Sequence, residues 1–237
     1  MEGSKYTSKY IKKAKGIKTE DGIALMRSYR RILLDRDLEE SKRYMKGVTL
    51  DVGGGRKRGN FKEPGDVTWI VLDNSREFRP HILGDAQNVP VKSNAVDCVK
   101  CTELLEHVES AERVIEEVLR ILKPDGTLIL SAPFIFKIHS DPYDFQRFTD
   151  QKLMRMLENG FDIITLKKQG LYFTVLAYMI KQCILNSKLH IRYFFYWLLP
   201  LLDLLVRLDN LAIIKNSKFM SSFTTGFFVV AVKKVRS

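Results

Sequence analysis

A short apolar run that ends in three consecutive glycines constrains the fold of this chain more than any other feature. Residues 48–55 are Val-Thr-Leu-Asp-Val-Gly-Gly-Gly, and further short apolar runs follow at 67–72, 81–83, 95–101 and 127–132. An amphipathic helix is predicted at 110–122, before the helix-ending turn Lys123-Pro124-Asp125-Gly126. Buried strands that alternate with helices form parallel sheets with right-handed crossovers. The pattern therefore predicts an α/β fold with a Rossmann-like doubly wound sheet.

The remaining segments predict how the chain is divided. Residues 1–46 are interpreted as a basic tail followed by a helical extension over 20–46, and residues 47–237 as one domain. Within that domain we expect a helix at 150–159 and strands at 161–167 and 223–233, the last of them antiparallel. Between these two strands, residues 171–221 are predicted to form a hydrophobic helical insertion.

Charge and cysteine content limit the partners and the compartment. The net charge is +11, and from Lys167 onward eleven Lys and Arg face two acids, which gives +9 and suggests an anionic partner. Three cysteines form no disulfide framework, which predicts a reducing, cytoplasmic setting. Cys98 and Cys101 make a CxxC, but residues three apart on a strand point to opposite faces, so no metal site is predicted.

The glycine turn and two aspartates predict a nucleotide-like ligand. Glycine lets the backbone turn tightly and approach a ligand, at the edge of the sheet where nucleotides bind. Asp73 ends the next strand 22 residues after Asp51, the spacing of a carboxylate that accepts from ribose hydroxyls. This position suits NAD as well, but Arg58 replaces the third glycine of the dinucleotide fingerprint. Asp85 either accepts from an adenine amine or ends a simple turn.

Five segments together resemble a known family. They are Leu50–Gly55, Asp73, Gly84–Ala86, Val96–Val108 and Leu119–Leu130, in that order. The ordered set resembles the small-molecule class I S-adenosylmethionine-dependent methyltransferases, which include ubiquinone and menaquinone methyltransferases. Lys57 and Asp125 depart from glycines that many members carry.

The resemblance implies S-adenosyl-L-methionine as cofactor and assigns a role to each motif residue. Asp51, with the backbone of Gly53 and Gly55, would hold the methionine end. Asp73 would take the ribose hydroxyls, and Asp85 with the Ala86 amide would take the adenine. Cys101 and Thr102, at the end of the fourth strand, would line the sulfonium.

The segment after the fifth strand carries the candidate catalytic residues. His139-Ser-Asp-Pro-Tyr-Asp144-Phe-Gln-Arg147-Phe-Thr149 lies at the edge where substrates bind, and similar patterns occur in methyltransferases associated with cell-surface glycan pathways. His139 and Asp144 are therefore candidates for acceptor activation, together with His107. The alternative is structural: Asp144 pairs with Arg147, Thr149 caps the next helix, and His107 anchors a helix.

The acceptor and the role of the insertion stay open at this level. A small-molecule, glycan or lipid-linked acceptor methylated on oxygen is the leading hypothesis. Nucleic-acid methylation is disfavoured, because Cys101-Thr102-Glu103-Leu104 stands where base amino-methylases carry Asn/Asp-Pro-Pro-aromatic, although the basic charge favours it. A non-catalytic binding subunit is a third class. Each apolar run in the insertion is too short to span a bilayer. The insertion could serve as an active-site lid, a homodimer surface or a peripheral contact with an anionic membrane.

Overall fold

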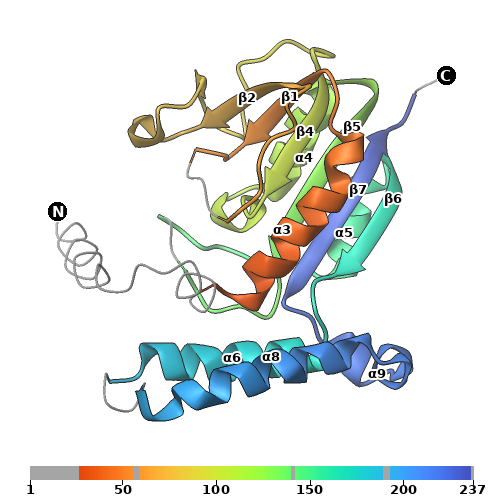
Figure 1. The fold of residues 1–237 in the computed structure, drawn as a ribbon. Coiled ribbons are helices and arrows are strands. Elements are labelled where there is room, and N and C mark those ends of the chain that lie inside the picture. The colour runs from red at the N-terminus through yellow and green to blue at the C-terminus, as the bar shows by residue number, and fades with distance from the viewer. Residues whose placement is uncertain (1–26, 56–58, 140–141, 189–192, 236–237) are drawn as a thin grey trace.

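A computed structural model describes residues 27–55, 59–139, 142–188 and 193–235 as a central sheet with helices on both faces (Figure 1). The seven strands are β1 (Val48–Val52), β2 (Thr68–Asp73), β3 (Ile82–Leu83), β4 (Val96–Thr102), β5 (Leu122–Pro133), β6 (Phe161–Lys168) and β7 (Gly226–Lys233). The α-helices are α3 (Tyr29–Ser41), α4 (Ala111–Ile121), α5 (Asp150–Leu157), α6 (Tyr172–Asn186), α8 (Leu199–Arg207) and α9 (Ala212–Asn216). Short 3₁₀ turns include η4 (Leu105–His107) and η6 (Leu208–Asn210).

The strand order is β3-β2-β1-β4-β5-β7-β6. Neighbouring strands pair in parallel from β3 to β5, and β7 is antiparallel to both β5 and β6. This confirms the prediction of a mostly parallel Rossmann-like sheet whose last strand is antiparallel. The last strand in the sequence does not extend the edge, because it inserts between β5 and β6.

Each face of the sheet is covered by helices that the sequence pattern predicts. Helix α4 buries Val114 and Val118 with α5 in the larger core, and Ser110 caps its first turn through Arg113 N. Helix α3 buries Leu34 and Leu38 on the other face, against strand residues that include Cys98. Cys101 belongs to the core on the α4 side, so the two cysteines do point to opposite faces.

The first helix is shorter than the sequence predicts. Helix α3 begins at Tyr29, where Ser28 caps it by accepting from Arg31 N, and a 3₁₀ turn continues the chain to Tyr44. The beginning of the predicted helix, residues 20–26, lies outside the described residues. The sequence sets this helix apart as an extension, yet it packs directly on the sheet.

The described residues 171–188 and 193–225 form an arm that contains α6, α8 and α9. Figure 1 shows α6 and α8 side by side beyond one end of the sheet. Lys168, at the end of β6, pairs with Phe227, and Pro133, at the end of β5, pairs with Gly226, so the arm leaves from the carboxyl end of β5. A small core of six buried side chains joins the arm to α3: Tyr29, Ala177, Tyr178, Ile184, Leu199 and Leu202. Among the described residues no helix is long and apolar enough to cross a membrane.

Candidate functional site

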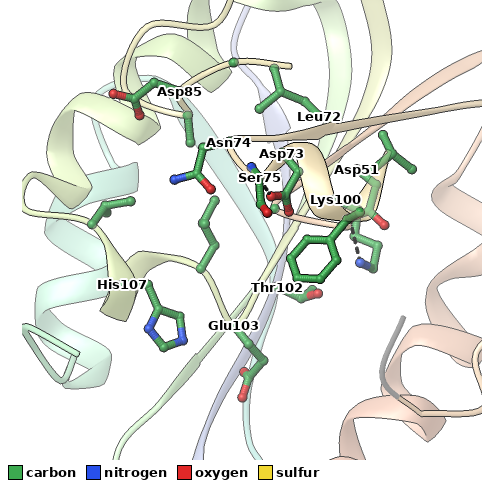
Figure 2. Close-up of a pocket in the computed structure, with 18 of the residues that line it drawn as sticks. Asp51, Leu72, Asp73, Asn74, Ser75, Asp85, Lys100, Thr102, Glu103 and His107 are labelled. Atoms are coloured by element: carbon green, nitrogen blue, oxygen red, sulfur yellow. Dashed lines mark hydrogen bonds and ion pairs between the residues drawn. The ribbon is translucent and has the colours of Figure 1, made fainter. Parts of the chain in front are cut away.

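A cleft of about 690 Å³ opens at the carboxyl ends of β1, β2 and β4. Figure 2 shows Asp73 and Ser75 near its middle, Asp85 on one side, and the Asp51–Lys100 pair on the other. Thr102, Glu103 and His107 come from the end of β4 and the turn after it. These residues lie at the edge where ligands bind in doubly wound sheets.

The glycine turn after β1 brings backbone against two carboxylates. A Cβ on Gly54 would lie 2.2 Å from Cγ of Asp51, and a Cβ on Gly55 would lie 2.7 Å from Oδ2 of Asp73. Gly53 has φ +74°, a conformation that L side chains rarely adopt. The turn therefore needs glycine for its own geometry, and the missing side chains leave a cradle of backbone beside the cleft.

The two cleft aspartates that follow β2 and β3 also hold loops in place. Asp73 accepts from Gly55 N at 3.0 Å and from Ser75 N at 2.9 Å, and it is 8% exposed. Asp85 accepts from Gln87 N at 2.8 Å, so it does form a local turn as well as line the cleft. A carboxylate oxygen can accept more than one hydrogen bond, so each side chain keeps capacity for a ligand.

Lys100 is a cleft residue that the sequence analysis did not single out. Its Nζ donates to Oδ1 of Asp51 at 2.7 Å, and both side chains are almost completely buried. Asp51 therefore acts as half of an ion pair on this side of the cleft. The available signal was a single basic residue inside the otherwise apolar run Cys98–Cys101, where buried charge requires a partner.

Thr102 and Cys101 differ in their access to the cleft. Thr102 lines it, whereas the Cys101 side chain is fully buried in the hydrophobic core. Burial raises the pKa of the Cys101 thiol to about 12, which keeps it protonated. The resemblance implied that both residues line the sulfonium, but only the Thr102 side chain reaches the cleft, because successive residues of a strand face opposite sides.

His107 and His139 come together on the far rim of the cleft. Their ring centroids lie 5.0 Å apart, and His107 itself lines the cleft. His139 lines a smaller adjoining cavity together with Arg30, Glu103 and Phe136. The structure thus joins two residues that are 32 positions apart in the sequence.

Asp144 faces His139 and not the cleft. Its side chain is 1% exposed, it accepts from His139 N at 2.9 Å, and its Oδ2 lies 3.3 Å from His139 Nδ1. Hydrogen bonds from Arg147 hold the pKa of Asp144 well below its usual value. Asp144 is thus placed to orient His139, and Thr149 caps α5 by accepting from Lys152 N, as the structural alternative predicted.

Two glutamates beside the histidines are held in opposite protonation states. Burial alone would raise the pKa of Glu103, but the charge and hydrogen bonds of Arg30, with a hydrogen bond from Ser131, outweigh it and lower that pKa to about 2. Burial, and then the negative charge of Glu103, raise the pKa of Glu106 to about 8. Burial also lowers the pKa of His139, which favours the neutral imidazole. Opposed pKa shifts of neighbouring groups are typical of active sites.

A family match covers the part of the chain that forms the cleft. A family model described as a methyltransferase domain matches residues 51–130, which run from Asp51 through the cleft residues of β2 and β4 to β5. Residues 51–130 of this chain therefore form a methyltransferase domain. The matched segment contains the glycine turn, Asp73, Asp85 and Thr102.

Curated relatives of this methyltransferase match over part of their length. The chain is 29% identical over 114 residues to a demethylmenaquinone methyltransferase of Paenarthrobacter aurescens, covering 44% of each protein. It is 26% identical over 130 residues to an uncharacterised protein of Methanocaldococcus jannaschii, covering 49% of this chain and 62% of that protein. The chain spans 15% to 62% of the length of the curated relatives it matches.

Solved structures with similar folds include those of methyltransferases and of a cyclase. A phosphoethanolamine N-methyltransferase 2 of Haemonchus contortus, in complex with S-adenosyl-L-methionine, has a TM-score of 0.53 at 17% identity over 85% of this methyltransferase and 53% of that chain. A putative methyltransferase of Bacillus halodurans has a TM-score of 0.51 at 15% identity over 85% and 99%. The [4+2]-cyclase SpnF has a TM-score of 0.52 at 18% identity over 85% and 81%. At this identity the likeness shows the fold alone.

Proposed function

We propose that this chain binds S-adenosyl-L-methionine in the cleft and transfers its methyl group to an oxygen of a small-molecule, glycan or lipid-linked acceptor. The observation that carries the proposal is the arrangement of Asp73, Asp85 and the glycine cradle within one cleft, beside a half-buried pair of histidines. Bound S-adenosyl-L-methionine supplies a methyl group already activated on a sulfonium. The protein's task is then mainly to orient the acceptor toward that methyl group.

Each cofactor residue is assigned a part of the proposed ligand. Asp73 would accept from the ribose hydroxyls, and Asp85 with the amide of Ala86 would bind the adenine. The Asp51–Lys100 pair and the backbone at Gly53 and Gly55 would surround the methionine end. Lys100 offers a positive charge there, which suits a carboxylate.

The histidines lie on the acceptor side of the proposed cofactor. A hydroxyl acceptor loses a proton during transfer, and a neutral imidazole oriented by a carboxylate can take it. His139 has this arrangement with Asp144, and Arg147 in turn pairs with Asp144 through Nη2 at 2.7 Å from Oδ2. We infer that His139 acts on the acceptor proton, that Asp144 positions it, and that His107 lines the acceptor's approach.

The cofactor proposal is tested by isothermal titration with S-adenosylhomocysteine. Asp73→Ala is expected to weaken binding by about 1.5–3 kcal/mol, because a charged hydrogen-bond acceptor is lost. This corresponds to roughly a 10- to 150-fold higher Kd. The affinity of Asp73→Asn should lie between those of the native chain and Asp73→Ala, since the amide keeps one acceptor oxygen.

Asp66→Ala, an exposed aspartate before the same strand, is the matched control and should leave the affinity unchanged. Equal affinity in Asp73→Ala, or tighter binding of NAD than of S-adenosylhomocysteine by the native chain, would refute the assignment. Tight binding without transfer to any hydroxyl, amine or thiol acceptor would instead support a non-catalytic binding subunit.

We also propose that the arm attaches reversibly to anionic membranes. Large apolar side chains are exposed along it: Tyr193, Phe194, Trp197, Leu201, Leu204, Leu211, Ile213 and Phe219. Exposed Lys188, Arg207, Lys215 and Lys218 lie in the same segment, whereas Arg192 lies outside the described residues. Lys181 does not contribute, because it is 4% exposed and donates to Arg27 O at 2.9 Å. Apolar and basic groups together give salt-sensitive attachment to anionic lipid.

Cosedimentation with vesicles of anionic lipid tests this attachment. We expect the native protein to pellet at low salt and to return to the supernatant at high salt, since screening weakens surface electrostatics. Phe194→Ser with Trp197→Ser should abolish pelleting. Ile164→Ser changes another exposed apolar residue, on β6 outside the arm, and should leave pelleting unchanged. Recovery of the native protein in the supernatant at low salt would leave the exposed face as a lid or a homodimer surface.

A further inference from the structure

Three side chains that could ligate a metal ion converge between the cleft and the smaller adjoining cavity. Glu106 and His107 belong to η4, and His139 lies on the loop after β5. Oε1 of Glu106 lies 3.6 Å from Nε2 of His107 and 3.9 Å from Nε2 of His139. One ligand atom from each of the three residues falls within 4.8 Å of the other two. The two imidazoles and the carboxylate therefore face one common point.

The hydrogen bonds of the two rings leave both Nε2 atoms available. Nδ1 of His107 contacts the carbonyl oxygen of Tyr143. Nδ1 of His139 lies 3.2 Å from the carbonyl oxygen of Lys137 and 3.3 Å from Oδ2 of Asp144. Because carbonyl and carboxylate oxygens only accept, each Nδ1 carries the proton and each Nε2 presents its lone pair. A histidine held through its other nitrogen in this way is the usual arrangement around a bound metal.

Glu106 supplies an independent indication of a cation site. Its side chain is fully buried, and neither carboxylate oxygen has a hydrogen-bond partner among the described residues. A buried carboxyl group without partners is costly, and proteins normally pair such a group or bind a metal with it. Oε1 lies near the Nε2 atoms of both imidazoles, where an ion would satisfy it.

We propose that Glu106, His107 and His139 bind one divalent transition-metal ion, such as Zn²⁺, at the acceptor side of the cleft. Two neutral imidazoles and one carboxylate suit Zn²⁺, Fe²⁺ or Co²⁺ better than Mg²⁺ or Ca²⁺, which prefer oxygen ligands. Bonds of about 2.0–2.1 Å in a tetrahedral site set ligand atoms about 3.3 Å apart. The two distances from Glu106 Oε1, 3.6 and 3.9 Å, are somewhat longer than this, and all three ligand atoms lie within 4.8 Å of one another, so the side chains need to move closer by small rotations to bind the ion.

Three protein ligands leave a coordination position for a further oxygen. The acceptor role of the ion rests on the proposed function, whereas metal binding itself does not. An acceptor hydroxyl on the ion would lose its proton more readily, because a metal lowers the pKa of bound oxygen groups. In the metal-loaded protein His139 would hold the ion in place of acting as the base, and the hydroxyl proton would leave to solvent.

Metal binding is measured on the full, untagged chain after chelator treatment. Isothermal titration with Zn²⁺, and the visible absorption of bound Co²⁺, should both give one ion per chain. His107→Gln and His139→Gln should each weaken Zn²⁺ binding at least tenfold. Asp144→Asn, which changes only the partner of a ligand, should weaken it by about 10- to 100-fold. His81→Gln is the matched control, because His81 lies before β3 and accepts from Val71 N away from this cluster.

The outcomes separate metal binding from the proposed methyl transfer. Glu106→Gln is the most direct test of the carboxylate, and circular dichroism with S-adenosylhomocysteine titration shows whether each variant is folded. If Glu106→Gln does not fold, the two histidine variants, whose side chains are partly exposed, decide the result. Unchanged stoichiometry and affinity in the histidine variants, or no one-to-one binding by the native chain, would overturn the site. Neither result would affect the cofactor affinity on which the proposed function is tested.

Discussion

Replacement of Arg30 by methionine is expected to lower the free energy of unfolding by about 3–5 kcal/mol, because it leaves a buried carboxylate without its partner. Arg30 is 2% exposed and donates through Nε to Glu103 at 2.8 Å and through Nη1 to Gln169 at 2.8 Å. Its guanidinium lies over Gly226 of β7, where a Cβ would overlap it. The contact ties α3 to the end of β4 and to β7. Denaturant unfolding followed by circular dichroism measures the loss.

The double variant Arg30→Met with Glu103→Met should recover much of this loss, because buried ion pairs can be replaced by apolar side chains at little net cost. Lys152→Met is the control: it breaks the exposed pair with Glu112 and should cost less than about 1 kcal/mol. A loss below about 1 kcal/mol in Arg30→Met would contradict the burial argument.

The same pair predicts an acid-sensitive stability. The folded-state pKa of Glu103 is about 2, below the ordinary value of 4.5, so its ionised form stabilises the fold above pH 4.5. That contribution is lost as the pH falls from about 4.5 toward about 2. The native chain should therefore lose stability over this interval more steeply than the double variant.

Replacement of Asp209 by alanine is expected to cost about 2–4 kcal/mol and to loosen the arm first, because several charge-assisted hydrogen bonds are lost together. Helix α6 has Leu171 at its N-cap, which provides no capping side chain. Asp209, from η6, accepts instead from Leu171 N at 2.8 Å, from Phe173 N at 3.0 Å and from Thr174 N at 2.9 Å. Thr174 Oγ1 donates to the same carboxylate at 2.7 Å.

Hydrogen exchange distinguishes a local loosening from a global one. Amides in the first turn of α6 should exchange faster in Asp209→Ala, while those of β4 and β5 keep the protection set by global stability. Asp209→Asn should have a smaller effect, since the amide retains one acceptor oxygen. Asp66→Ala changes a residue in an exposed turn, and its free energy of unfolding should stay within about 0.5 kcal/mol of that of the native chain. Equal exchange in α6 of the native and alanine chains would show that packing alone holds the arm.

Local patterns in the sequence were sufficient for the main elements. The apolar run at 48–52 and the helix at 110–122 follow from side-chain periodicity, and Ser110 follows from capping chemistry. The order of the cleft motifs predicted a methyltransferase, and the match to a methyltransferase domain over residues 51–130 agrees with it. Each of these features depends on residues that are close in the chain, so the chain itself carries the signal.

Contacts between distant residues could not be predicted in this way. The insertion of β7 between β5 and β6 depends on pairing of strands far apart in sequence. The Arg30–Glu103 pair joins residues 73 positions apart, and Asp209 caps a helix that begins more than 30 positions earlier. No periodicity or spacing encodes which of several charged residues will meet.

The candidate site shows the same division. Sequence motifs nominated Asp51, Asp73 and His139 because their types and positions suit a nucleotide cleft and an acceptor. Only the fold placed Lys100 against Asp51, turned Cys101 into the core, and brought Glu106 beside two histidines. The physical reason is that burial, partner and orientation are properties of packed surroundings, which form when segments distant in sequence come together. Local sequence determined which groups this chain carries to the sheet edge, and tertiary packing decided which of them face one another.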